Sequence, residues 1–201
     1  MTPAEGDALA AERQRLSAVS SVAGEVARHV HEFSHLRANA APRWLTQLGV
    51  PAGWQIGHLT ASTVEPSRIA VCDQRPDGGW DGCETITVFG FTGIPPDGVV
   101  RNNADRSLRD LAATGVTTER VDISALRGAL AVRSSGYFVL ADRWVSAQYS
   151  TYVFGSTESS QGRLIEHTVF IESGSQARLS GDVAELTQAV HQALAAAAAR
   201  K

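Results

Sequence analysis

Lysine is almost absent from this chain of 201 residues, because only the terminal Lys201 is of that type. The formal net charge is −3, and no run of arginine replaces the missing lysines. General nucleic-acid binders and binders of anionic membranes carry a surplus of basic residues. The composition therefore argues against both classes of partner. A GC-rich genome, whose codons favour arginine and alanine, accounts for the scarcity of lysine.

Long hydrophobic runs are absent as well. No stretch approaches the roughly 18 apolar residues that a helix needs to cross a bilayer. The first seven residues are acidic, and they show neither the basic nor the apolar region of a secretory signal peptide. We therefore expect a cytoplasmic protein without a membrane span. Secretion by a route that needs no such signal stays open.

Cysteine occurs only twice, at Cys72 and Cys83. The two residues flank a turn signal at 76–79 that separates two strand-like runs. A hairpin there brings the two cysteines nearly opposite each other, so a cross-strand disulfide is possible in an oxidising compartment. Two free thiols are the alternative in a reducing one. Without a histidine nearby, the pair does not make a zinc site.

Motifs of the common enzyme classes are missing too. The chain has no phosphate-binding glycine loop and no serine in a nucleophile elbow, and strands do not alternate with helices. His58, His167 and His191 have no neighbours that suggest a catalytic triad. His167 alternates with Ile165 and Val169, which predicts a hydrogen-bonded histidine of the core. We expect no enzymatic activity and no cofactor.

The N-terminal region is rich in alanine, glutamate, arginine and leucine, and it predicts one helix over residues 4–40. Apolar residues recur there at alternating spacings of three and four, at Leu16, Val19, Ala23, Val26, Val30 and Phe33. Such a stripe must be buried, either on the chain's own sheet or against a partner helix, which includes a second copy of the chain. Together with Trp80 in a glycine-rich turn, it is our candidate partner-binding surface.

The same predicted helix carries a possible metal site. The run from His31 to His35 matches the zinc-protease pattern H-E-x-x-H, with Glu32 as the general base. On a helix, however, both histidines would lie opposite the apolar stripe, and no third ligand motif follows. A histidine cluster on the surface is the interpretation that we favour, and a zinc-dependent hydrolase is the alternative.

Beyond the breakers at 42–53, short strand-like runs predominate. A helix is expected after Asn102 or Asn103, and a last helix from Ser180 with a buried stripe at Val183, Leu186, Val190 and Leu194. Consecutive hairpins with helices at the ends predict an α+β fold, an antiparallel sheet covered by helices. We place an N-terminal amphipathic helix at 1–43 and the folded domain at 44–201.

A family resemblance covers residues 44–197. It is carried by the segments 99–105 (VVRNNAD), 126–137 (LRGALAVRSSGY) and 147–149 (AQY), with a helix between the first two. These segments resemble actinobacterial LpqN-type proteins, which belong to a wider PsbP-like sandwich group that includes chaperones for secreted effectors. The resemblance implies an antiparallel sheet with packed helices and a non-enzymatic binding role.

Three functions follow from the sequence. The first is a protein-binding, chaperone-like adaptor that docks a partner through the N-terminal helix or the sheet face. The second is the zinc-dependent hydrolase. The third is a small-molecule or lipid pocket between the sheet and a helix.

Overall fold

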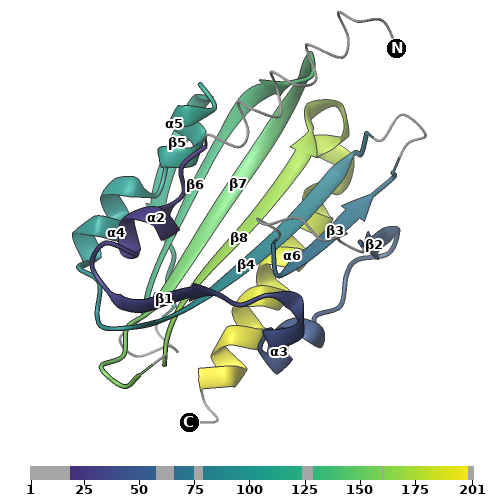
Figure 1. Ribbon diagram of the computed structural model, residues 1–201. Helices are drawn as coiled ribbons and strands as arrows, with labels where there is room; N and C mark the ends of the chain where they lie inside the picture. Colours follow the sequence, from purple (N-terminus) through teal and green to yellow (C-terminus); the bar gives the residue numbers. More distant parts are fainter. Residues whose placement is uncertain (1–18, 58–65, 75–78, 124–128, 160, 199–201) are drawn as a thin grey trace, which may run out of the picture.

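The computed structural model describes residues 19–57, 66–74, 79–123, 129–159 and 161–198 (Figure 1). Its helices are α2 (Val22–Val26), α3 (Arg43–Thr46), α4 (Asp97–Asn103), α5 (Arg106–Asp110) and α6 (Gln176–Ala198). Its strands are β1 (His31–His35), β2 (Trp54–Ile56), β3 (Arg68–Cys72), β4 (Gly82–Thr92), β5 (Thr114–Arg120), β6 (Ala129–Leu140), β7 (Arg143–Phe154) and β8 (Gly162–Glu172).

The strands form one antiparallel sheet in the order β2-β3-β4-β8-β7-β6-β5, and β1 pairs with β4 beside this path. Strands β6, β7 and β8 are long because alternate residues can be buried on both faces of the sheet. β6 and β7 are joined by a two-residue turn in which Ala141 and Asp142 both have positive φ, as a type I′ hairpin requires.

Helices cover both faces of the sheet, which makes three layers (Figure 1). Helix α6 packs on one face against residues such as Ile86, Tyr152 and Ile171, and we call this the α6 face. Helices α2, α4 and α5 pack on the other, against residues such as Phe91 and Phe138, and we call this the α2 face. The α+β fold with a helix-covered antiparallel sheet is thus confirmed.

The last helix has the predicted buried stripe, since Leu186, Val190 and Leu194 are buried. Val183 is half-buried at the edge of this contact. The helix begins earlier than predicted, at Gln176 rather than near Ser180, and the additional turn buries Leu179 against the sheet. Among the described helices, none is long and apolar enough to cross a membrane.

The prediction of one helix over residues 4–40 is wrong for the described part of that range. Helix α2 has five residues, and the chain then turns into β1, which pairs with β4 from His31 opposite Thr92 to His35 opposite Phe89. Hydrogen bonding to the edge of β4 outweighs the helical propensity of the local sequence. Residues 4–18, which include Leu16, lie outside the described residues.

The predicted boundary at residue 43 does not separate two packed units. β1 belongs to the sheet, and α2 contributes Val22, Ala23 and Val26 to the core on the α2 face. Phe33 of β1 stacks on Phe89 of β4 with ring centroids 4.9 Å apart. Residues 19–35 are therefore part of the same domain as the strands that follow.

Candidate functional site

A groove of about 410 Å³ lies where α6 crosses β5–β8. Its sheet side is formed mainly by Thr117, Ser135, Tyr137, Ser146, Gln148, Val169 and Ile171. Its helix side is formed by Gln176, Ser180 and Val183 at the N-terminal half of α6. We call this the α6 groove, and its volume falls within the range of about 300–1,000 Å³ found for ligand sites.

Two side-chain hydrogen bonds connect the walls of the α6 groove. Gln176 Nε2 lies 3.2 Å from the Tyr137 hydroxyl, and Gln148 Nε2 donates to Thr187 Oγ1 at 3.0 Å. Both bonds join α6 to the β6–β7 hairpin. Because they fix the helix above the strands, the groove is part of the resting structure and does not have to be opened by a ligand.

None of the described residues that line the α6 groove carries a charge. The lining combines hydroxyl and amide groups with the apolar side chains of Val169, Ile171 and Val183. A charged ligand entering such a site would lose water without gaining a countercharge, which costs free energy. The groove therefore suits an uncharged occupant with both polar and apolar parts.

Exposed apolar side chains border the α6 groove at the end of the β6–β7 hairpin. Trp144 is 52 % exposed and lies directly opposite Val139 in the β6–β7 register, and Tyr137 is also exposed. All three occupy positions on the α6 face, beyond the cover of the helix. We call Tyr137, Val139 and Trp144 the hairpin patch, and such a patch beside a groove is typical of a binding surface.

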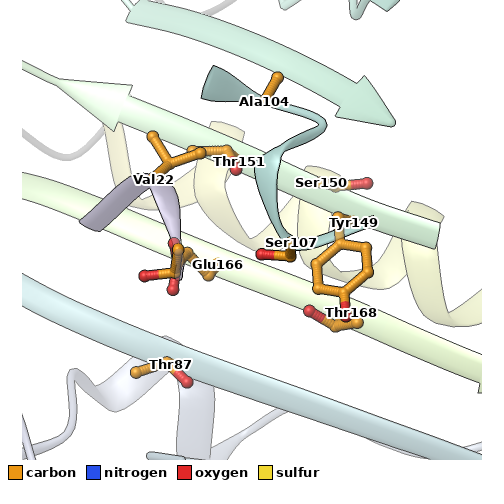
Figure 2. Close-up of a pocket in the computed structure, with 10 residues that line it drawn as sticks. Val22, Thr87, Ala104, Ser107, Tyr149, Ser150, Thr151, Glu166 and Thr168 are labelled. Atoms are coloured by element: carbon orange, nitrogen blue, oxygen red, sulfur yellow. The ribbon is translucent and has the colours of Figure 1, made fainter. Parts of the chain in front are cut away.

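A second, much smaller cavity of about 50 Å³ lies on the α2 face, beneath α2 and α5 (Figure 2). Glu166 of β8 faces into it, with Thr87 of β4 and Thr151 of β7 as its direct cross-strand neighbours. One Glu166 carboxyl oxygen accepts the backbone N–H of Ala23 at 3.1 Å. Burial raises the pKa of Glu166, and it also raises the pKa of nearby Tyr149. A cavity of this size has room for water but not for a substrate.

A buried charge cluster lies on the α6 face. Glu84 accepts from Arg68 Nη1 at 2.9 Å, and its other oxygen lies 3.0 Å from His167 Nε2. All three side chains are almost completely buried, and the Arg68 guanidinium also donates to the backbone oxygen of Gly49. The prediction for His167, a hydrogen-bonded histidine of the core, is confirmed.

The structure lacks the geometry on which the zinc hypothesis depends. His31 and His35 lie on strand β1 with a bulge between them, not one turn apart on a helix. Glu32 bonds to Thr92 and Ser159, and His35 Nε2 lies 3.4 Å from Ser67 Oγ. Within the described ranges, no group of three His, Cys, Asp or Glu side chains is arranged to hold a metal ion.

The cysteines are not opposite each other. Val71 pairs with Cys83, and Cys72 pairs with Gly82, so the register is displaced by one residue. Because successive side chains of a strand point to opposite faces, the two thiols lie on different sides of the sheet. Both are buried and free, and burial raises the pKa of Cys83 to about 12. The predicted hairpin is correct, but a disulfide across it does not fit this register.

The candidate partner-binding residues lie mostly inside the domain. Ala23, Val26 and Val30 are buried on the α2 face, and Val19 and Phe33 pack against its core from the edge. Of the two alternatives for the stripe, packing on the chain's own sheet is the one observed. Trp80 is half-buried, with its ring 6.2 Å from that of Phe170, so it folds over the sheet. A docking role for these residues stays a prediction.

Sequence reasoning missed the residues of the α6 groove. They come from β5 to β8 and from α6, and only the crossing angle of the helix brings them together. Tyr137, Val139 and Trp144 carried a usable signal, since large apolar residues beside the tip of a hairpin have little cover. Glu166 carried a second signal. Successive side chains of a strand point to opposite faces, so a glutamate next to the core histidine His167 points into the core on the other face of the sheet.

The chain is thus an α+β protein in which helices cover both faces of one antiparallel sheet and leave an open groove beside α6. No protein-family model and no curated protein matches the sequence. Among solved structures, the chain is similar to LpqN of Mycobacterium tuberculosis, described as involved in cell envelope biogenesis. The TM-score is 0.57 and the identity is 16 %, over 83 % of this chain and 93 % of that chain. The LpqN-like fold is thus confirmed.

Proposed function

We propose that this chain is a non-enzymatic, chaperone-like binding protein that docks an uncharged segment of a protein partner in the α6 groove. The observation that carries the proposal is the uncharged lining of a pre-formed groove beside the exposed hairpin patch. Apolar side chains of the partner would cover the patch, and its backbone or amide groups would bond to the hydroxyl and amide groups inside. The LpqN-like fold supports extending the setting of cell envelope biogenesis to this chain.

A second candidate is a small-molecule or lipid site in the same groove. The volume of about 410 Å³ favours it, because that volume is sufficient for a ligand of modest size. The two candidates share the site and differ in the occupant, so one experiment can separate them.

The test uses two arginine variants of α6. Ser180 lines the groove and is exposed, so Ser180→Arg places a charge at the groove without disturbing the core. Gln192→Arg places the same charge on an exposed position of α6 about 18 Å farther along the helix. Tagged full-length chains are purified from the native host after crosslinking, and thermal unfolding confirms that both variants are folded.

We expect a discrete partner with the unmodified chain and with Gln192→Arg, and at least a tenfold lower yield of it with Ser180→Arg. Equal yields from all three chains would contradict the groove as the docking site. Native mass spectrometry of the same samples shows whether a bound molecule of a few hundred daltons is lost from Ser180→Arg instead, and that result would favour the second candidate.

A further inference from the structure

Strand β5 forms one end of the sheet, because it pairs with β6 on one side and, among the described residues, with no strand on the other. It is the longest of the three described strands that have a single neighbour, since β2 has three residues and β1 has five. Residues 117–120 are all exposed, and β5 contains neither lysine nor proline. Lysine and proline are two of the means by which natural proteins keep an edge strand from pairing with another chain.

The hydrogen bonds to β6 show which backbone groups of β5 point to the open edge. Directly after β5, the Val121 N–H donates to the Ala131 oxygen at 3.0 Å, so this pair is of the hydrogen-bonded type. In an antiparallel ladder such pairs alternate with pairs that share no backbone bond. The N–H and C=O groups of Thr118 and Arg120 are therefore directed away from β6. The side chains agree, because Thr118 Oγ1 lies 2.8 Å from Ser134 Oγ, and side chains are closer in pairs without backbone bonds.

A bulge limits the usable length of this edge. The register with β6 changes between Thr114 and Thr117, and Gly115 has a φ of 60°. A bulge of this kind bends its strand and interrupts regular pairing. Regular strand at the open edge is therefore confined to residues 116–120.

The charges of β5 select one register for pairing with a second copy of the chain. A two-fold axis at a given residue places that residue opposite its own copy. An axis at Glu119 or Arg120 would place like charges opposite each other, which destabilises a strand pair. An axis at Thr118 avoids this, since Glu119 then lies opposite Thr117 of the second copy. Arg120 likewise lies opposite Val116. An axis nearer the N-terminus of β5 would move the pairing into the bulge.

We propose that β5 pairs antiparallel with β5 of a second copy about a two-fold axis at Thr118, so that the sheet continues from one chain into the other. The outward N–H and C=O groups of the two Thr118 residues bond to each other. The axis is perpendicular to the sheet, which keeps the α6 faces of both chains on the same side. Thr117 lines the α6 groove and lies beside the axis, so the two grooves become neighbours. This pairing does not depend on what the groove binds.

The strength of the pairing follows from its length. An interface formed by residues 116–120 of each chain is smaller than the roughly 1,200 Å² at which stable complexes begin. Interfaces below this size are typical of weak and transient complexes. We therefore expect monomers in dilute solution and dimers at high concentration.

Sedimentation equilibrium of the full chain, from micromolar to millimolar concentration, tests the proposal. The average mass should rise from 21.3 kDa toward twice that value. Thr118→Pro removes the outward N–H without breaking a bond to β6, and it should keep the chain monomeric. Thr118→Val loses the same hydroxyl but keeps the N–H, so this matched control should dimerise like the unmodified chain. Circular dichroism checks that both variants are folded.

Amide hydrogen exchange locates the interface in the unmodified chain, so the test does not depend on the proline variant. Protection of the Thr118 amide should increase several-fold with concentration, while that of Glu119, which is directed toward β6, should change little. A chain that stays monomeric at every concentration contradicts the proposal. A dimer in which the Thr118 amide exchanges as fast as in the monomer uses another surface and also contradicts it. Equal dimerisation of the two Thr118 variants leads to the same conclusion.

Discussion

The two faces of the sheet hold glutamates in different surroundings. On the α6 face, Glu84 is almost completely buried but lies within hydrogen-bonding distance of Arg68 and His167. On the α2 face, Glu166 is half-buried, the described residues that line the cavity beside it are neutral, and it accepts the N–H of Ala23. The first arrangement joins β3, β4 and β8 on the face covered by α6. The second places a carboxyl beneath a helix of five residues.

The faces differ in access as well. The α6 face is covered by the long helix α6 together with α3, and the α6 groove and the hairpin patch stay open at the β5–β7 side. The α2 face is covered by α2, α4 and α5, and the cavity beneath them is only about 50 Å³. We infer that binding belongs to the α6 face and that the α2 face is held closed by its N-terminal segment.

The largest effect is expected from removal of residues 1–42, which deletes α2 and β1. The sequence predicts that residues 44–197 fold alone, but β1 pairs with β4, and α2 covers buried residues such as Phe91 and Leu130. We therefore expect loss of the cooperative thermal transition, measured by circular dichroism. A transition as sharp as that of the full chain would show that the segment is dispensable.

Breaking the charge cluster on the α6 face comes next. Arg68→Met leaves Glu84 buried without its cation, which costs about 3–5 kcal/mol of unfolding free energy. Urea denaturation measures this value. The double variant Arg68→Met with Glu84→Gln removes the charge that was left behind, and it should recover part of the loss. No recovery would indicate that the packing of the Arg68 side chain, and not charge compensation, explains the effect.

A charge in the core of the α2 face is expected to cost several kcal/mol. Val26 is completely buried, so Val26→Glu places an unpaired carboxylate among apolar side chains. Arg28, two residues on, is exposed, and its pair with Glu25 is worth at most about 1 kcal/mol, so Arg28→Glu is the matched control. The melting temperature of the isolated chain should fall sharply only for Val26→Glu. Equal melting temperatures for the two variants would mean that α2 does not contribute to the core.

The smallest effect is expected at the histidines of β1. His31 is exposed and His35 half-buried, and replacing both with alanine should change the unfolding free energy by about 0.5 kcal/mol or less. Calorimetry checks the stability, and elemental analysis of protein prepared without chelator checks the metal content. Stoichiometric zinc that disappears in the double variant, together with peptidase activity, would restore the hydrolase hypothesis.

Local patterns predicted a large part of this fold. The stripe of α6 and the pairing of β3 with β4 follow from periodicity and from the turn signal at 76–79, which depend on neighbours in sequence. β1 could not be predicted in this way, because it is a strand only through pairing with β4, from His31 to the distant Thr92. The α6 groove depends in turn on how α6 crosses four strands, and no local pattern encodes that angle.

The central claim is that the open side of the α6 face binds a partner, and site-specific photocrosslinking tests it most directly. A photoreactive amino acid replaces Trp144 in the hairpin patch or, as control, Ile94, which is 68 % exposed at the opposite end of the sheet. Irradiation in the native host should give one discrete adduct from position 144 and none from position 94. Adducts in equal amount from both positions, or none from position 144, would contradict the claim.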